Sequence, residues 1–123
     1  MIEDDDTDAK TVHPLLAEIQ GNKANAYVIV LSGKSQIGRS FKIEGEMVIG
    51  RGDGLDIVID GEGISRRHAK LTKLAGGQVQ LDDLNSTNGT FCNGLRVRTQ
   101  LLNDGDKIQV GVPAILKFTS QDA

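Results

Sequence analysis

From Tyr27 onward the chain consists of short runs in which apolar and polar residues alternate or β-branched residues cluster. The alternation is cleanest in residues 78–82 (QVQLD) and 107–110 (KIQV), as in a strand with one buried face and one solvated face. Nine such runs are present, nearly all bounded by Gly, Asn, Asp or Ser: 27–31, 38–43, 47–49, 57–59, 68–74, 78–84, 90–92, 107–110 and 114–118. This pattern predicts an all-β fold, an antiparallel β-sandwich with little room for helix.

The first 25 residues follow a different pattern. Residues 1–14 are acidic and lack periodicity, which predicts a disordered N-terminal arm. Residues 15–25 form a connecting segment, in which LLAEIQ (15–20) has helical spacing of its apolar residues for about one turn before Gly21 and Asn22.

The net charge of −3 is an average of two unlike parts. Five of the 17 acidic residues lie in the first eight positions, so residues 9–123 carry 14 cations against 12 acids. With one Tyr, three Phe and no Trp, this weakly basic body offers nucleic acid little to bind. No apolar run approaches the roughly 18 residues of a membrane span, and the acidic N-terminus does not resemble a secretory signal. We therefore expect a cytoplasmic protein with no membrane or nucleic-acid partner.

The chain also has few residues that could bind a metal or form a disulfide. Cys92 is the one cysteine, and His13 and His68 are the only imidazoles. These residues allow no internal disulfide and are too few for a zinc centre, so we expect no metal and no cofactor.

Polar side chains concentrate in three turns, at residues 50–54 (GRGDG), 61–68 (GEGISRRH) and 83–90 (DLNSTNGT). Together they supply guanidinium, hydroxyl and amide groups, which suit an oxyanion carried on a peptide. Ser65 and His68 are three residues apart, and this odd offset at the start of an extended strand directs them to opposite faces. No nucleophile is paired with a base, so the chain is not expected to be an enzyme.

These turns, together with Asn93-Gly94 and Asp104-Gly105-Asp106, resemble in order and spacing the forkhead-associated (FHA) domain over residues 26–119. The resemblance implies a sandwich of about 11 strands in two twisted sheets that recognises phosphothreonine peptides. Two more strands than the nine runs are then expected, near residues 95–97 and 101–103.

The resemblance also assigns roles to single residues. It implies that Arg51 and Ser65 hold the phosphate, that Arg66 supports it, that Thr87 lines a pocket for the threonine methyl group, and that Asn88 binds the peptide backbone just after the phosphothreonine. Five further residues are implied to shape the site without touching ligand: Gly50, His68, Asn85, Ser86 and Gly89.

The acidic arm contains two threonines, Thr7 and Thr11. In bacterial FHA proteins a phosphothreonine in the N-terminal extension can bind the protein's own FHA site or that of a neighbour, and this arrangement looks similar. Thr11 is the preferred phosphorylation site for a serine/threonine kinase and Thr7 the second choice. The alternative is that the arm is only a solubilising leader.

The last residues suggest a larger context. Residues 115–122 resemble the segment that leads from a bacterial FHA domain into a GGDEF diguanylate cyclase domain, which makes cyclic-di-GMP. Residues 120–123 would then begin a linker to a C-terminal domain. The alternatives are a stand-alone adaptor that binds a partner phosphoprotein and a β-sandwich that binds another protein or carbohydrate through a different surface. The sequence leaves open the partner, the kinase, the residue preference after the phosphothreonine and the oligomeric state.

Overall fold

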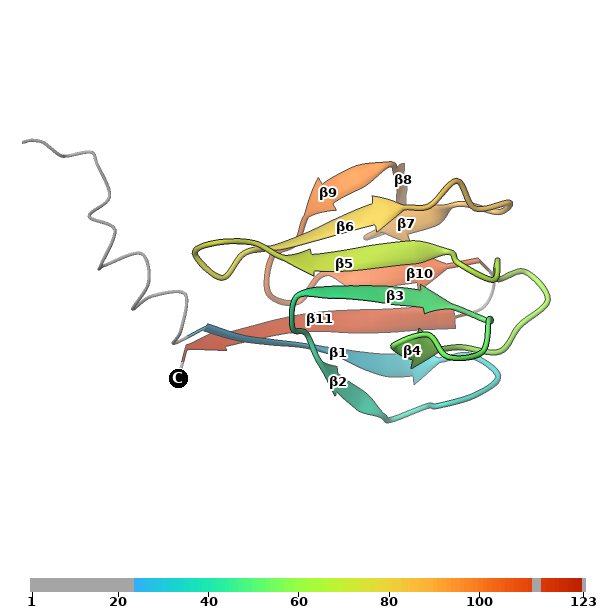
Figure 1. The fold of residues 1–123 in the computed structure, drawn as a ribbon, viewed down its shortest axis with the longest axis horizontal. Coiled ribbons are helices and arrows are strands. Elements are labelled where there is room, and N and C mark those ends of the chain that lie inside the picture. The colour runs from blue at the N-terminus through green and yellow to red at the C-terminus, as the bar shows by residue number, and fades with distance from the viewer. Residues whose placement is uncertain (1–23, 112–113, 123) are drawn as a thin grey trace, which may run out of the picture.

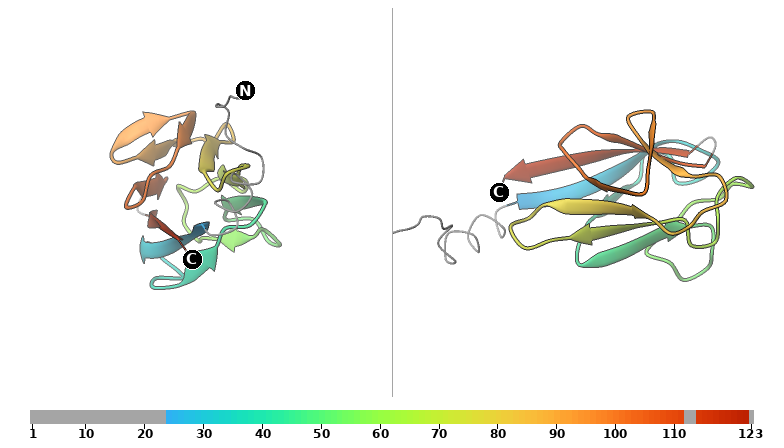
Figure 2. Two further views of the ribbon diagram at one scale, coloured as in Figure 1. Left: turned by 90° about the vertical axis from the view of Figure 1, so that its left-hand side faces the viewer. Right: turned by 90° about the horizontal axis from the view of Figure 1, so that it is seen from above.

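The computed structural model describes residues 24–111 and 114–122, which form two β-sheets packed face to face (Figures 1 and 2). Eleven strands follow one another along the chain: β1 (Ala24–Ser32), β2 (Ser40–Lys42), β3 (Glu46–Gly50), β4 (Ile57–Val58), β5 (Ala69–Lys73), β6 (Val79–Asp83), β7 (Thr90–Cys92), β8 (Leu95–Val97), β9 (Thr99–Leu101), β10 (Lys107–Val110) and β11 (Ala114–Asp122). The expected all-β sandwich of about 11 strands is thus confirmed.

Six strands form one sheet in the order β2-β1-β11-β10-β7-β8, and five form the other in the order β4-β3-β5-β6-β9. Neighbouring strands are antiparallel except for β3 and β4, which pair in parallel. This pair departs from the antiparallel expectation because the chain turns back over residues 51–56 before β4 begins. The Asp56 carboxylate fixes that return by accepting the Val48 N–H at 2.9 Å.

The nine runs correspond to nine of the observed strands, and the two added strands are present as well. One of the two is β8, at the expected residues, whereas β9 lies two residues earlier than the expected 101–103. The largest difference is at the two ends of the fold. Ala24 pairs with Asp122 and Ala26 with Ser120, so residues 24–25 and 120–122, which the sequence assigned to a connecting segment and a linker, belong to the sheet. β1 and β11 satisfy each other's backbone hydrogen bonds here, so both strands extend past the residues in which apolar and polar positions alternate.

Aliphatic side chains fill the space between the sheets, as the scarcity of aromatic residues requires. The fully buried large residues include six isoleucines, and Phe118 is the one buried aromatic residue among those described. Two of the polar side chains in this interior, His68 and Thr90, have no exposed surface. Buried polar groups need hydrogen-bonding partners, and both residues find theirs next to the candidate site.

The two ends of the sandwich differ. The loops after β3, before β5 and after β6 lie at the right-hand end in Figure 1, whereas β1 begins and β11 finishes at the left-hand end. Within the described ranges, the structure contains no helix long and apolar enough to span a membrane.

Candidate functional site

Three neighbouring strands bring the three polar loops together. Ile49 of β3 is opposite Ala69 of β5, and Ala69 is opposite Asp83 of β6. Since the strands are antiparallel, the end of β3, the start of β5 and the end of β6 lie side by side. Loop 51–56, segment 59–68 and loop 84–89 therefore share one end of the sandwich (Figure 1).

The end of β3 is joined closely to the segment before β5. The Arg51 N–H donates to the Ser65 carbonyl and the Gly52 N–H to the Arg66 carbonyl, each at 3.1 Å. A side chain at Gly50 would overlap the Arg66 carbonyl oxygen, so only glycine permits this approach. The expected role of Gly50 thus has a physical basis in the structure, which places Arg51 beside Ser65 and Arg66.

His68 connects segment 59–68 to loop 84–89. Its Nδ1 accepts the Ser65 N–H at 3.0 Å, and its Nε2 lies 2.8 Å from the Gly89 carbonyl oxygen. Because Nδ1 is an acceptor, the hydrogen of the neutral ring is on Nε2, which donates to Gly89. The buried ring thereby sets the distance between two loops that carry candidate binding residues.

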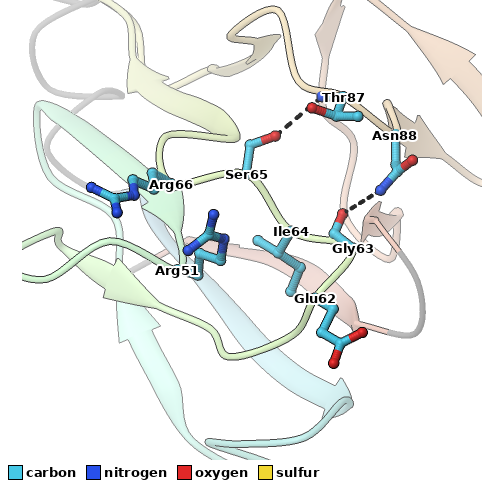
Figure 3. Close-up of a pocket in the computed structure, with 8 residues that line it drawn as sticks. All are labelled: Arg51, Glu62, Gly63, Ile64, Ser65, Arg66, Thr87 and Asn88. Carbon is cyan, nitrogen blue, oxygen red and sulfur yellow. Dashed lines mark hydrogen bonds between the residues drawn. The ribbon is translucent and has the colours of Figure 1, made fainter.

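Two further hydrogen bonds join these loops at the surface (Figure 3). The Ser65 Oγ accepts the Thr87 N–H at 3.1 Å, and the Asn88 Nδ2 donates to the Gly63 carbonyl at 2.9 Å. The side chains of Thr87 and Asn88 remain exposed. They are therefore held in place by their loop while still accessible to a ligand.

Loop 84–89 is itself organised around the Asp83 carboxylate. The hydroxyls of Ser86 and Thr90 donate to its Oδ1 at 2.6 and 2.7 Å, and the Ser86 N–H donates to its Oδ2 at 3.2 Å. Ser86 Oγ also accepts the Gly89 N–H at 2.9 Å. Burial of the carboxylate is the largest single influence and raises its pKa, but the hydrogen bonds from the Ser86 and Thr90 hydroxyls and from the Ser86 N–H together outweigh it and leave the Asp83 pKa below its usual value.

The backbone of this loop explains two other expected residues. Asn85 has a φ of 59° and Gly89 a φ of 92°, both in the left-handed region that Asn and Gly tolerate best. Asp83 and Thr90, which hold the loop together, were not among the residues predicted from sequence. The sequence does contain a signal for them: Asp83 is a carboxylate three residues before Ser86, and Thr90 is the first residue of the next strand. Such residues at the start and end of a loop are typical of local side-chain to backbone hydrogen bonding.

An open pocket of about 270 Å³ lies between the loops, lined by Arg51, Glu62, Gly63, Ile64, Ser65, Arg66, Thr87 and Asn88. All five predicted binding residues are thus brought to one place. In Figure 3 the Arg51 and Arg66 side chains lie on the same flank of the Ser65 loop, and the Glu62 carboxylate is directed away from them. Neither guanidinium has a hydrogen bond or ion pair with any residue that the structure describes. The pocket therefore combines two uncommitted cations with a hydroxyl group.

The arrangement of Ser65 and His68 does not suit nucleophilic catalysis. Ser65 lies before β5, so strand alternation is not what separates the two side chains. Instead, both ring nitrogens are engaged with backbone groups, and neither can accept a proton from the Ser65 hydroxyl. Among residues 24–111 and 114–122, no three His, Cys, Asp or Glu side chains gather as a metal ion would require.

Comparison with known proteins assigns this architecture to a family. The model of the FHA domain family matches residues 47–111. The FHA domain-containing protein FhaA of Mycobacterium tuberculosis is 40% identical over 80 residues, which are 64% of this chain and 15% of FhaA. The glycogen accumulation regulator GarA of Mycolicibacterium smegmatis is 32% identical over 94 residues, 76% of this chain and 59% of GarA. The chain thus spans less than two thirds of the length of either relative.

A solved structure from a study of phosphothreonine-dependent FHA domain interactions superimposes with a TM-score of 0.72 at 32% identity. The match covers 80% of this chain and 99% of that one.

Proposed function

Because the chain belongs to the FHA domain family, we propose that it recognises phosphothreonine peptides through the pocket formed by its three loops. An FHA domain is a recognition module and not an enzyme. The observation that supports the proposal most directly is the pair of guanidinium groups of Arg51 and Arg66 beside the Ser65 hydroxyl, neither of which is hydrogen-bonded or ion-paired to a described residue. A phosphate monoester carries close to two negative charges at neutral pH, and forked guanidinium donors match its oxygens.

Three further residues that line the pocket would contact the rest of the ligand. Thr87 and the buried Ile64 both line it and would contact the threonine methyl group. The Asn88 Nδ2 is already bonded to Gly63, which leaves the Asn88 Oδ1 to accept a backbone N–H of the peptide.

Titration with three matched peptide libraries tests the proposal, each with a fixed central residue: phosphothreonine, phosphoserine or threonine. We expect binding to the first, weaker binding to the second and none to the third. Arg51→Ala should weaken phosphothreonine binding about 10- to 100-fold, since a hydrogen bond to a charged group contributes about 1.5–3 kcal/mol. Arg67→Ala is the matched control, because Arg67 is exposed and does not line the pocket. Equal binding of the unphosphorylated library would instead indicate a protein-binding surface of another kind.

The ligand that we propose is the protein's own N-terminal arm, phosphorylated by a serine/threonine kinase at Thr11 or Thr7. Both threonines lie outside the described residues. The arm joins the fold at Ala24, at the end opposite the pocket, and β1 alone spans about 26 Å of the distance between them. The 13 peptide units between Thr11 and Ala24 average about 18–22 Å as a coil and reach about 45 Å when extended.

Capture of Thr11 by its own domain therefore needs a stretched arm, whereas capture by a neighbouring molecule does not. Thr7 has 17 units and reaches further, to about 56–61 Å. Sedimentation of the kinase-treated chain separates the two arrangements. A monomer with no remaining affinity for added phosphopeptide indicates binding in cis, and a dimer that Arg51→Ala abolishes indicates binding in trans. Unchanged peptide affinity after complete phosphorylation would contradict both.

A separate proposal concerns the activity that this domain regulates. A diguanylate cyclase of the GGDEF type is supported by residues 115–122, yet these residues form most of β11, where Leu116 and Phe118 are buried as the sandwich itself demands. A stand-alone adaptor for a partner phosphoprotein is the alternative. We place either form in the cytoplasm, since Cys92 is a free and buried thiol and the arm requires a kinase. The coding sequence after Ala123 distinguishes the two outputs by the presence or absence of a GGDEF domain.

A further inference from the structure

The outward face of the six-stranded sheet has an unbalanced charge. Strand register and alternating burial direct thirteen side chains to this outer face: Asn25, Tyr27, Ile29, Ser32, Ser40, Lys42, Phe91, Arg96, Lys107, Gln109, Ile115, Lys117 and Thr119. Four of them are cationic and none is acidic. In the part of the chain that the structure describes, these cations have no ion pair on the face apart from Lys42, which reaches the exposed Glu44 beyond the end of its strand at 3.6 Å.

The placement of two lysines makes the imbalance more pronounced. Lys107 of β10 is directly opposite Lys117 of β11, and like charges directly opposite each other destabilise a sheet. The five-stranded sheet avoids this arrangement on its own outward face. There Lys70 has Glu46 at 3.6 Å and Asp82 as its cross-strand partner. The protein therefore balances charge on one sheet and leaves it unbalanced on the other, as expected where an anionic partner completes a surface.

Apolar groups are interleaved with these cations. Ile29 is the neighbour of Lys117 on one side, as Lys107 is on the other. Gln109 separates Ile115 from Phe91, and Phe91 is opposite Arg96. The apolar side chains Tyr27, Ile29, Phe91 and Ile115 are all partly exposed. A partner that matches this surface must offer both carboxylates and aliphatic side chains.

We propose that the outer face is the docking surface for the chain's own N-terminal segment, residues 3–19. That segment has the required chemistry, since it contains the acidic run at positions 3–6, Asp8, and the aliphatic residues Leu15, Leu16 and Ile19. Docking joins the acidic run to the lysine pair and places the aliphatic residues over Tyr27 and Ile29. It needs no phosphate, so it does not depend on recognition of phosphothreonine.

The point of attachment and the length of the segment fit this surface. The segment joins the sheet at Ala24, in a strand that crosses the outer face, and Gly21 and Asn22 allow the chain to turn back. The lysine pair is level with Ile29, five residues or about 17 Å along β1 from Ala24. Asp8 precedes Ala24 by 16 residues, which extend to about 53 Å, so the acidic run reaches the lysines with chain to spare.

Paramagnetic broadening of backbone amide signals in the unphosphorylated full chain tests the docking. A nitroxide is attached at Ala9→Cys in a Cys92→Ala background, which leaves one reactive thiol, and the ¹⁵N-labelled protein is observed by NMR. We expect selective loss of amide intensity in β1, β10 and β11 around Ile29, Lys107 and Lys117. The double charge reversal Lys107→Glu/Lys117→Glu should abolish this loss. The control Lys70→Glu/Arg98→Glu changes the net charge equally and should preserve it, because Lys70 is in the five-stranded sheet and the Arg98 carbonyl accepts the Asp83 N–H at the end of β6 in that sheet.

The dispersion of the amide signals shows that each variant is folded. Broadening that survives the reversal at the outer face, that is spread evenly over the domain, or that is confined to the loops around Arg51 would overturn the proposal. Mixing spin-labelled ¹⁴N chain with unlabelled ¹⁵N chain identifies an arm contributed by another copy. Broadening of the same strands in that mixture would also overturn docking within one molecule. Failure of any of these tests leaves the peptide titrations unaffected, because they report on the loops.

Discussion

Replacing His68 with alanine should disturb stability and ligand binding together, because the buried ring is the link between two loops. The variant loses the hydrogen bonds of Nδ1 with the Ser65 N–H and of Nε2 with the Gly89 carbonyl. Each bond contributes about 0.5–1.5 kcal/mol, and a buried donor left without a partner costs about 1–3 kcal/mol. We expect the free energy of unfolding to fall by about 2–6 kcal/mol, a large part of the roughly 5–15 kcal/mol typical of a domain.

Affinity for a phosphothreonine peptide should fall as well, although His68 does not line the pocket. Without the ring, the Ser65 N–H loses its hydrogen-bond acceptor. The Ser65 hydroxyl and the Thr87 N–H that donates to it are then no longer held in a fixed position. Urea denaturation measures the first effect. Calorimetric titration under conditions where the variant remains folded measures the second.

A matched control separates positioning from general weakening. Leu116 is fully buried in β11, away from the loops, and Leu116→Ala should cost a similar 2–5 kcal/mol or so through lost burial and a cavity. That variant should keep its peptide affinity once folded. The reasoning is refuted if His68→Ala unfolds with nearly the wild-type free energy, or if it binds peptide as tightly as Leu116→Ala does.

Three other substitutions test separate parts of the site. Gly50→Ala should abolish peptide binding and lower stability by several kcal/mol, because the new methyl group meets the backbone of Arg66; retained peptide binding in a titration would contradict this close approach. Asp83→Asn should lower stability by about 1–3 kcal/mol at neutral pH. Since the folded pKa of Asp83 is lowered, its stabilising effect is complete above the unfolded value near 4 and is lost as the pH falls through the folded value, so urea denaturation should show the variant and wild type converging below about pH 4. Asn88→Ala should change stability by less than about 1 kcal/mol, because its bond to Gly63 is exposed, but should weaken peptide binding severalfold; equal affinities would exclude Asn88 from the interface.

The sequence was informative where a local pattern determines the structure. Strict alternation located β10 at its observed residues, and turn residues marked the ends of most other strands. It was less informative where pairing with a distant segment decides the outcome. The final residues of β11 have no periodic signal of their own and are strand only because residues 24–26 lie beside them.

The same distinction applies to the site. Family resemblance named five of the eight residues that line the pocket, since their types and order are recognisable along the chain, but it did not name Glu62, Gly63 and Ile64. Asp83 and Thr90 were missed because their importance depends on hydrogen bonds to Oδ1 that only the folded loop brings together. Likewise, the opposing pair Lys107 and Lys117 is visible only once the register of β10 and β11 is known.

The geometry of the sandwich connects the two proposals about the arm. The arm is attached at one end and its proposed phosphothreonine site is at the other, so a free coil of average dimensions falls short of the pocket from Thr11. An arm docked along the outer face already follows β1 towards the end where the loops lie. Much of the conformational entropy that stretching the arm costs has then been lost before phosphorylation. Phosphorylation adds about 1.5–2 negative charges, which the outer face also attracts, but the pocket offers two guanidinium groups beside a hydroxyl. The lysine pair would then act as a guide for the arm, with Arg51 and Arg66 supplying the specificity.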